Sequence, residues 1–301
     1  MKIDLLTLYN YRNYNNLNLK LSSNINIFTG FNAQGKTNII EAIYFSSLGI
    51  SHRTRTEGDL ILWGKDEASI NVKFSKRDIN SILKIILKKN KRKELNFNGE
   101  IIKQKDLPGL LTMILFSPED LMLIKGSPLL RRRFIDIELS QISRIYYNEL
   151  VQYNRLLLQR NNLLKKIREN KKLIPMLDTW DEQIAKAAAF IVEKRLRGIK
   201  KLSKLAQEIH CEISQKMEIL DIRYNIHNYK NEALNSFDDL FNFYIKALSK
   251  YRDNDIYRGS TSVGPHRDDI DFFINDISLK SFGSQGQQRS SVLSLKLASS
   301  F

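Results

Sequence analysis

Hydrophobic and polar positions near the start of the chain predict a strand, a loop and a helix in that order. Residues Asn24 to Thr29 alternate polar and apolar, which is typical of a strand. From Lys36, apolar residues recur at helical spacing until Gly49, a residue type that commonly ends a helix. A glycine-rich segment lies between the two patterns, so the sequence predicts a strand that runs through a tight loop into a helix.

The rest of residues 1–116 is expected to be rich in strands. Ile70 to Phe74 and Ile82 to Leu87 have the composition and alternation of strands. Asn98-Gly99 follows Leu95 and Phe97, and this dipeptide favours the tight turn of a hairpin. The basic run Lys88 to Lys93 fits a solvated hairpin tip or a loop that touches phosphates.

Residues 117–258 are expected to form a helical lobe. Ser117-Pro118 and Ser127-Pro128 are each typical of a helix start, with serine as the cap and proline in the first turn. Helices are predicted near 128–170 and 178–215, divided around Pro175, and again over 220–250. The tyrosine and leucines with coiled-coil-like spacing are interpreted as the core of this lobe rather than as a partner surface: Leu150, Tyr153, Leu157 and Leu164.

Residues 259–301 return to strand-like patterns and end in a helix. Ile270 to Ile274 and Ile277 to Leu279 are predicted to pair as strands, and Gln288 to Ser299 has apolar residues at helical spacing. We therefore expect residues 1–116 to form one lobe with the glycine-rich loop, 117–258 to form the helical lobe, and 259–301 to return to the first lobe.

Composition favours a polyanionic partner. The 301 residues carry a net charge of +15, and the pI is about 9.7. This surplus indicates nucleic acid first and an anionic membrane second, although the richness in Lys, Asn and Ile also fits codon bias. The single cysteine, Cys211, excludes an internal disulfide and a Cys/His zinc cluster. With no signal-peptide pattern at the N-terminus, we expect a soluble cytoplasmic protein.

The glycine-rich loop has the chemistry of a phosphate-binding P-loop. Residues 30–37 match G-x-x-x-x-G-K-[ST] at every fixed position. Glycines let successive backbone N–H groups face phosphate oxygens, Lys36 would reach the β- and γ-phosphates, and the Thr37 hydroxyl would bind Mg²⁺. The residues expected to hold ATP in this loop are Gly30, Phe31, Asn32, Ala33, Gln34, Gly35, Lys36 and Thr37.

A second loop has the chemistry of an ABC-type signature motif. Ser284, Gln285, Gly286 and Gln287 follow a predicted strand pair and open a predicted helix. A serine hydroxyl and glycine N–H groups at a helix N-terminus form an anion site. Because the chain already has a P-loop, we expect this second loop to face the γ-phosphate held by another subunit.

The combined motifs resemble the RecF family, the bacterial recombination-mediator ATPases of the ABC and SMC class. The segments that carry the resemblance are residues 9–14, 30–41, 51–54, 116–121, 126–128, 131–136, 264–269 and 284–289. The resemblance implies an α/β fold like an ABC/SMC head, with a mixed sheet and an inserted helical lobe. It also implies ATP and Mg²⁺ as cofactors, an ATP-dependent homodimer on gapped or single-stranded DNA, RecR and RecO as partners, and RecA loading as the outcome.

The same resemblance adds four candidate residues. Asn38 belongs to the extended P-loop, and Arg12 resembles an N-terminal arginine that approaches the nucleotide. Arg53 and Arg55 lie where such ATPases carry an arginine loop that links DNA to ATP, although a surface ion pair explains them equally well. Arg131 to Arg133 are a further basic feature expected to support DNA binding. The turn with His266 and Arg267 is interpreted as a structural corner rather than a site.

The chain departs from the family after the signature helix. An apolar strand that ends in paired acids is expected next, and no such segment follows, so no catalytic residue is assigned. We expect a truncated chain with hydrolysis slower than in complete relatives. Three alternatives stay open: the ATPase head of an SMC-like repair protein, the ATPase subunit of a transporter, and a scaffold whose P-loop only stabilises the fold.

Overall fold

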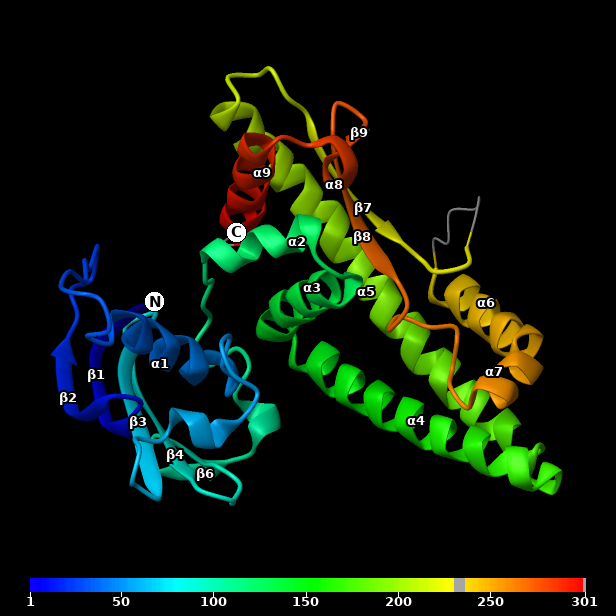
Figure 1. Cartoon of the computed structure of the whole chain (residues 1–301), viewed down its shortest axis with the longest axis horizontal. Coiled ribbons are helices and arrows are strands. Elements are labelled where there is room, and N and C mark those ends of the chain that lie inside the picture. Colours follow the sequence, from blue (N-terminus) through cyan, green and yellow to red (C-terminus); the bar gives the residue numbers. More distant parts are fainter. Residues whose placement is uncertain (230–235, 300–301) are drawn as a thin grey trace. The chain divides into compact units, whose positions relative to one another are not determined.

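The computed structural model describes residues 1–229 and 236–299, and the chain divides into two compact units (Figure 1). The first unit is Met1–Met113 and the second is Ile114–Phe301. This boundary lies within three residues of the predicted end of the first lobe. Residues 259–301 belong to the second unit together with the helical segments, and their predicted return to the first lobe stays a prediction.

The first unit contains a six-stranded sheet in the order β2-β1-β3-β4-β5-β6. Its strands are β1 Lys2–Tyr11, β2 Tyr14–Lys20, β3 Glu67–Lys76, β4 Ile79–Lys88, β5 Glu94–Phe97 and β6 Glu100–Ile102. The predicted hairpin is confirmed: Asn98 and Gly99 join β5 to β6 with φ angles of 52° and 93°, the backbone that favours this dipeptide.

Helix α1, Lys36–Leu48, begins and ends as the sequence predicts. Gly49 caps its C-terminus with φ 67°, and the Gly49 N–H donates to the carbonyl oxygen of Phe45. Ile39, Ala42 and Phe45 pack in the same core cluster as the buried residues of β1, β3 and β4. The loops of this unit contain the short 3₁₀ helices η1 Glu57–Leu60 and η2 Gln104–Asp106.

The strand predicted for residues 24–29 is wrong. These residues form no β-ladder with any described residue, and the side chains of Ile25 and Ile27 are 81% and 80% exposed. Alternation alone does not make a strand, because the backbone also needs a neighbouring strand for its hydrogen bonds. All strand pairs of the described residues are antiparallel, so the parallel pairs of the expected mixed sheet do not occur among them.

The second unit is built around two long antiparallel helices, α4 and α5 (Figure 1). The short η4, Lys171–Leu173, and Pro175 separate the two, as predicted. Tyr153 and Leu164 are buried on α4, so the interpretation of the periodic stripe as lobe core is confirmed. The elements from η3 to α7 are η3 Pro118–Leu121, α2 Met122–Lys125, α3 Pro128–Ile142, α4 Arg144–Glu169, α5 Met176–Ile213, α6 Phe237–Lys250 and α7 Arg252–Arg258.

A three-stranded antiparallel sheet, β7-β8-β9, packs with α5 and the last helix, α9. Its strands are β7 Leu220–Asn225, β8 Asp269–Ile274 and β9 Ile277–Ser278, followed by α8 Leu279–Phe282 and α9 Gln285–Ala298. The helix predicted over 220–250 is therefore wrong at its start. Leu220, Ile222 and Tyr224 alternate with polar residues and pair with β8, so the two-residue period outweighs helix propensity.

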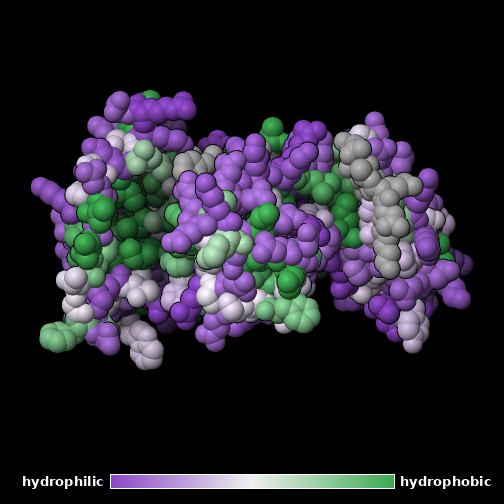
Figure 2. Space-filling model, turned by 90° about the horizontal axis from the view of Figure 1, so that it is seen from above, coloured by the Kyte–Doolittle hydropathy of each residue, from purple (hydrophilic) through white to green (hydrophobic). Residues whose placement is uncertain are grey.

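Hydrophilic side chains cover most of the face of the molecule drawn in Figure 2. Within the described ranges, no helix is both long enough and apolar enough to cross a membrane.

Candidate nucleotide site and signature helix

The P-loop backbone has the conformation that its glycines permit. Gly30, Ala33 and Gly35 have positive φ angles of 141°, 65° and 94°. At Gly35, a Cβ would lie 2.6 Å from Asn13 Oδ1 and 2.8 Å from the Tyr14 hydroxyl, so both the backbone angle and the space require glycine. Gly35 is also the N-cap of α1 and supplies no capping side chain. The first amides of α1 therefore remain suitable donors for an anion.

Lys36 lies across the loop that precedes it. Its Nζ donates to the carbonyl oxygens of Gly30 and Phe31, each at 2.7 Å. These contacts hold the ammonium group at the loop, where phosphate oxygens can replace the carbonyl oxygens as acceptors. Thr37 is exposed at the start of α1. Its hydroxyl can therefore approach a metal ion bound to a phosphate.

A polar frame supports the P-loop, and sequence reasoning assigned no role to two of its members. The Tyr14 hydroxyl donates to the carbonyl oxygen of Gln34 at 3.2 Å, and Asn38 Nδ2 donates to Asn13 Oδ1 at 2.9 Å. Asn13 lies in the turn between β1 and β2, and Tyr14 is the first residue of β2; both are among the segments that carry the family resemblance. From the sequence, the family resemblance of this segment was the signal that could have pointed to Asn13 and Tyr14.

Glu41 is the buried centre of the charges beside the P-loop. Its carboxylate accepts two bonds from Arg12, at 2.7 and 2.9 Å, one from Ser51 at 2.6 Å and one from Arg53 at 3.3 Å. Burial favours the neutral acid, but the hydrogen bonds from Arg12 and Ser51 and the charges of Arg12 and Arg53 outweigh it and lower the pKa of Glu41. Sequence reasoning assigned no role to Glu41, because its partners are dispersed along the chain.

These contacts place two of the predicted arginines, Arg12 and Arg53. Arg12 binds Glu41 and donates to the carbonyl oxygen of Asp59 at 2.9 Å, and Arg53 binds Glu41 and the Asn38 side chain. Arg55 is exposed and makes no side-chain hydrogen bond or ion pair with the described residues. The ion-pair interpretation thus fits Arg53. Contacts of Arg12 with nucleotide, and of Arg53 and Arg55 with DNA, stay predictions.

The signature residues form the N-terminus of α9. Ser284 Oγ accepts the Gln287 N–H at 3.2 Å, and Gln287 Oε1 accepts the Ser284 N–H at 2.9 Å, a reciprocal capping box. A hydroxyl that accepts one bond still has its own proton to donate. A Cβ at Gly286 would contact only Ser284 Oγ, at 3.7 Å, so the turn is open to a ligand.

The expectation that Arg131 supports DNA binding is wrong. Arg131 is 2% exposed, and its Nε and Nη2 donate to the Asp269 carboxylate at 2.7 and 2.9 Å. Nη1 of the neighbouring Arg132 donates to the carbonyl oxygen of Asp268 at 2.6 Å. The helical period of α3 turns these guanidinium groups toward β8. Both arginines therefore stabilise the second unit.

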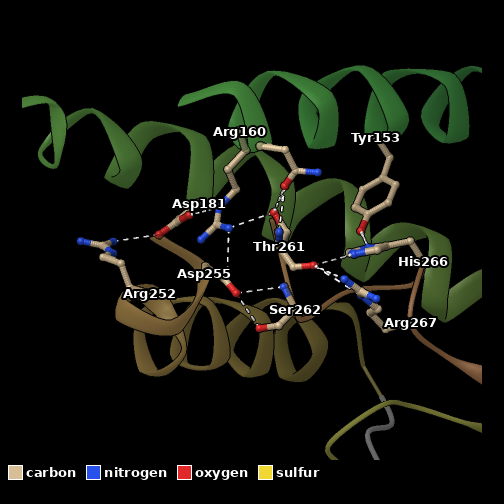
Figure 3. A network of polar contacts seen from close by, with 10 residues as sticks. Tyr153, Arg160, Asp181, Arg252, Asp255, Thr261, Ser262, His266 and Arg267 are labelled. Carbon is tan, nitrogen blue, oxygen red and sulfur yellow. Dashed lines mark hydrogen bonds and ion pairs between the residues drawn. The ribbon is translucent and has the colours of Figure 1, made fainter. Parts of the chain in front are cut away.

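His266 and Arg267 form a structural corner, as the sequence interpretation favoured (Figure 3). The His266 ring lies 2.5 Å from the Tyr153 hydroxyl through Nδ1 and 3.1 Å from the carbonyl oxygen of Thr261 through Nε2. Arg267 Nη2 donates to the same carbonyl at 3.1 Å. Burial lowers the pKa of His266 to about 4, so the ring is neutral at pH 7 and serves as a fixed hydrogen-bonding group.

Comparison with known proteins identifies the family. The family model described as RecF/RecN/SMC N terminal domain matches residues 2–300. The DNA replication and repair protein RecF of Clostridium perfringens is 44% identical over 300 residues, which are 99% of this chain and 81% of the relative. The chain belongs to the RecF family. RecF of Clostridium botulinum is likewise 44% identical over 300 residues and is covered to 80% of its length.

Solved structures agree with this family. The structure of the recombination mediator protein RecF with ATP, in the RecFOR pathway, matches this RecF-family chain with a TM-score of 0.94 and 32% identity. The match covers 99% of this chain and 80% of that one. The Smc head bound to the C-terminal winged-helix domain of ScpA, at 17% identity and a TM-score of 0.52, shares the fold alone.

The fold and the general activity follow from these matches. The predicted α/β fold of an ABC/SMC-type P-loop ATPase is confirmed, and the chain is an ATP-binding RecF-type ATPase of DNA replication, recombination and repair. None of the matches favours an SMC-like head of another complex or a transporter subunit. The individual roles of the P-loop, signature and arginine residues stay predictions.

Proposed function

We propose that this RecF-family chain is a cytoplasmic DNA clamp switched by ATP. ATP at the P-loop of one subunit meets the signature helix of a second copy, and closure of the homodimer retains gapped or single-stranded DNA. The observation that carries this proposal is that one chain has two helix N-termini open to anions. One opens at Gly35 with Lys36 beside it, and the other opens at Ser284 and Gly286.

The residues at both ends have separate tasks. The α1 amides and Lys36 would hold the phosphates, Thr37 would bind Mg²⁺, and Asn38 and Arg12 would line the same site. The cation would neutralise phosphate charge. Ser284 would donate its hydroxyl proton to the γ-phosphate across the dimer, with the Gly286 N–H beside it. A subunit that holds ATP therefore needs a partner to complete its site.

Charge supports DNA as the ligand. With a net charge of +15, binding should depend mainly on phosphate contacts and fall steeply as salt rises, with little sequence preference. Arg53 and Arg55 follow α1, and Arg53 binds Asn38 and Glu41 on that helix. DNA contact at these arginines would thus act on the helix that begins at the P-loop, which favours an ATPase stimulated by DNA.

The partners are proposed from the solved relatives. The matched RecF structures are described as parts of the RecFOR pathway. By this relation, we propose that the closed dimer acts with RecO and RecR to promote RecA loading at the single-stranded region.

Fluorescence anisotropy of labelled gapped duplex DNA tests the switch. We expect ATP and Mg²⁺ to tighten DNA binding by about tenfold or more, and Lys36→Ala and Ser284→Arg each to abolish that gain. Lys65→Ala, which removes one exposed charge from the same unit as Lys36, is the control and should retain the gain. Equal binding with and without ATP, unchanged by Lys36→Ala, would support the scaffold and refute the clamp.

A further inference from the structure

A chain of hydrogen bonds leads from the signature motif into the interior of the second unit. Gln287 Nε2 donates to Glu218 Oε1 at 2.9 Å, and Glu218 Oε2 lies 3.0 Å from His210 Nε2. His210 is fully buried near the end of α5, and its Nδ1 lies 3.2 Å from the Ser294 hydroxyl of α9. None of these contacts belongs to the P-loop or to the predicted signature contacts with ATP.

The donors and acceptors of this chain fix the orientation of the Gln287 amide. The Ser284 N–H can only donate, so it requires Gln287 Oε1. An ionised Glu218 can only accept, so it requires Gln287 Nε2. A flipped amide would face a donor with a donor and an acceptor with an acceptor. Glu218 therefore holds the side chain that completes the cap of Ser284.

His210 in turn holds Glu218. An ionised Glu218 carboxylate can only accept, so His210 Nε2 carries the proton of that contact. Nδ1 of the same ring lies 3.2 Å from the Ser294 hydroxyl, which also lies 2.8 Å from the carbonyl oxygen of Ser290. The helices on both sides are fixed, because α5 and α9 pack through the shared core of Ala206, Val292 and Leu295. The position of the Glu218 carboxylate is thus set by the core.

We infer that Glu218 and His210 are positioning residues for the signature motif. They hold Gln287 so that the Ser284 hydroxyl and the Gly286 N–H meet the γ-phosphate of a second copy. This inference rests on the proposed function, because it requires the signature helix to contact ATP across the dimer. It adds that residues outside the motif, in the interior of the second unit, hold the signature motif in position.

Three variants separate positioning from general stability. Glu218→Ala removes the carboxylate. Gln287→Glu keeps the cap, since glutamate serves at this position of a capping box, but opposes Glu218 with a like charge. The pair Glu218→Gln with Gln287→Glu reverses the amide and the carboxylate. It restores the bond between the two side chains with the same net charge as the natural chain.

The measurements are ATP-dependent dimerisation by sedimentation velocity and binding of a fluorescent ATP analogue to the monomer. We expect Glu218→Ala and Gln287→Glu each to raise the dimer dissociation constant by about tenfold, and the pair of substitutions to return it to within about threefold of the natural value. Glu218→Ala should leave the monomer's affinity for the analogue within about twofold, because the P-loop does not use Glu218.

The outcomes are distinct. Dimerisation of Glu218→Ala equal to that of the natural chain, or a paired variant no better than Gln287→Glu, would overturn the inference. If Glu218→Ala fails to fold, Gln287→Glu and the paired variant decide the question alone, since Gln287 is partly exposed. A natural chain that does not dimerise on ATP, or a Ser284→Arg variant that dimerises normally, would instead overturn the proposed function.

Discussion

At the scale of single residues, the site depends on charges that are buried and paired rather than free. Glu41 of α1 is inaccessible to solvent, and its carboxylate accepts hydrogen bonds from Arg12, Ser51 and Arg53. Removing one partner of such a group leaves the others desolvated and uncompensated, which is costly. The sequence identified both arginines as candidates. It could not show what holds them, because Arg12 lies 29 residues from Glu41 in the chain.

Substitution of Glu41 tests this account. Arg12 donates to both carboxylate oxygens, so the NH₂ group of Glu41→Gln faces an arginine donor in either orientation. We expect the variant to lose about 2–3 kcal/mol in its free energy of unfolding at pH 7. Urea unfolding measures the loss, and Glu100→Gln, at an exposed position of β6, should change stability by less than about 0.5 kcal/mol.

The pH dependence of the Glu41→Gln effect has a definite sign. The folded protein lowers the pKa of Glu41 below its ordinary value of 4.5. The stabilisation by the carboxylate is therefore fully present above that value and is lost as the pH falls through the lower folded pKa. The stability gap between the natural chain and Glu41→Gln should narrow in acid. A gap that stays constant from pH 7 to about pH 3 would contradict the assignment.

At the scale of elements, local chemistry was predictable and long-range pairing was not. The Asn98-Gly99 hairpin and the end of α1 at Gly49 depend on neighbours in the chain, and both are as predicted. β7 depends on β8, with Leu220 opposite Ile274, and was predicted as helix. Residues 24–29 show the converse error, because their alternation has no paired strand among the described residues. Arg131 likewise finds its partner, Asp269, far along the chain.

A buried ion network joins the elements of the second unit (Figure 3). Arg160 of α4 is fully buried and donates to Asp181 of α5 and Asp255 of α7, each at 2.7 Å. Asp255 also accepts the Ser262 N–H at 3.0 Å, which ties the chain after α7 to the same centre. This network holds in place the segment that runs from α7 to the corner at His266. The second unit should therefore depend on it strongly.

Loss of Asp255 tests the strength of the network. We expect Asp255→Ala to lower the free energy of unfolding by about 3–5 kcal/mol, because the Arg160 charge stays buried with one carboxylate fewer. Glu193→Ala on α5 is the control. Its partner Arg197 is 69% exposed, so the loss should be below about 1 kcal/mol. Thermal unfolding followed by circular dichroism compares the two, and similar losses would show that the buried network contributes no more than a surface pair.

At the scale of the whole molecule, the two motifs lie in different compact units of one chain. The P-loop belongs to Met1–Met113, and the signature helix α9 belongs to Ile114–Phe301. The family and its general ATPase function were predictable because their motifs are dispersed over the whole chain, and the match over residues 2–300 confirms them. The proposed assembly adds one requirement: each ATP site must be completed by the signature helix of another copy.

Complementation between two variants tests this requirement most directly. In a mixed dimer of Lys36→Ala and Ser284→Arg chains, one composite site retains both an intact Lys36 and an intact Ser284, while the other site has lost both. Each variant alone should show no gain in binding to gapped DNA on addition of ATP. An equimolar mixture should recover about a quarter of the natural gain, since about half of the pairs are mixed and each keeps one of two sites. No recovery in the mixture, with both variants folded, would contradict an ATP site shared between subunits.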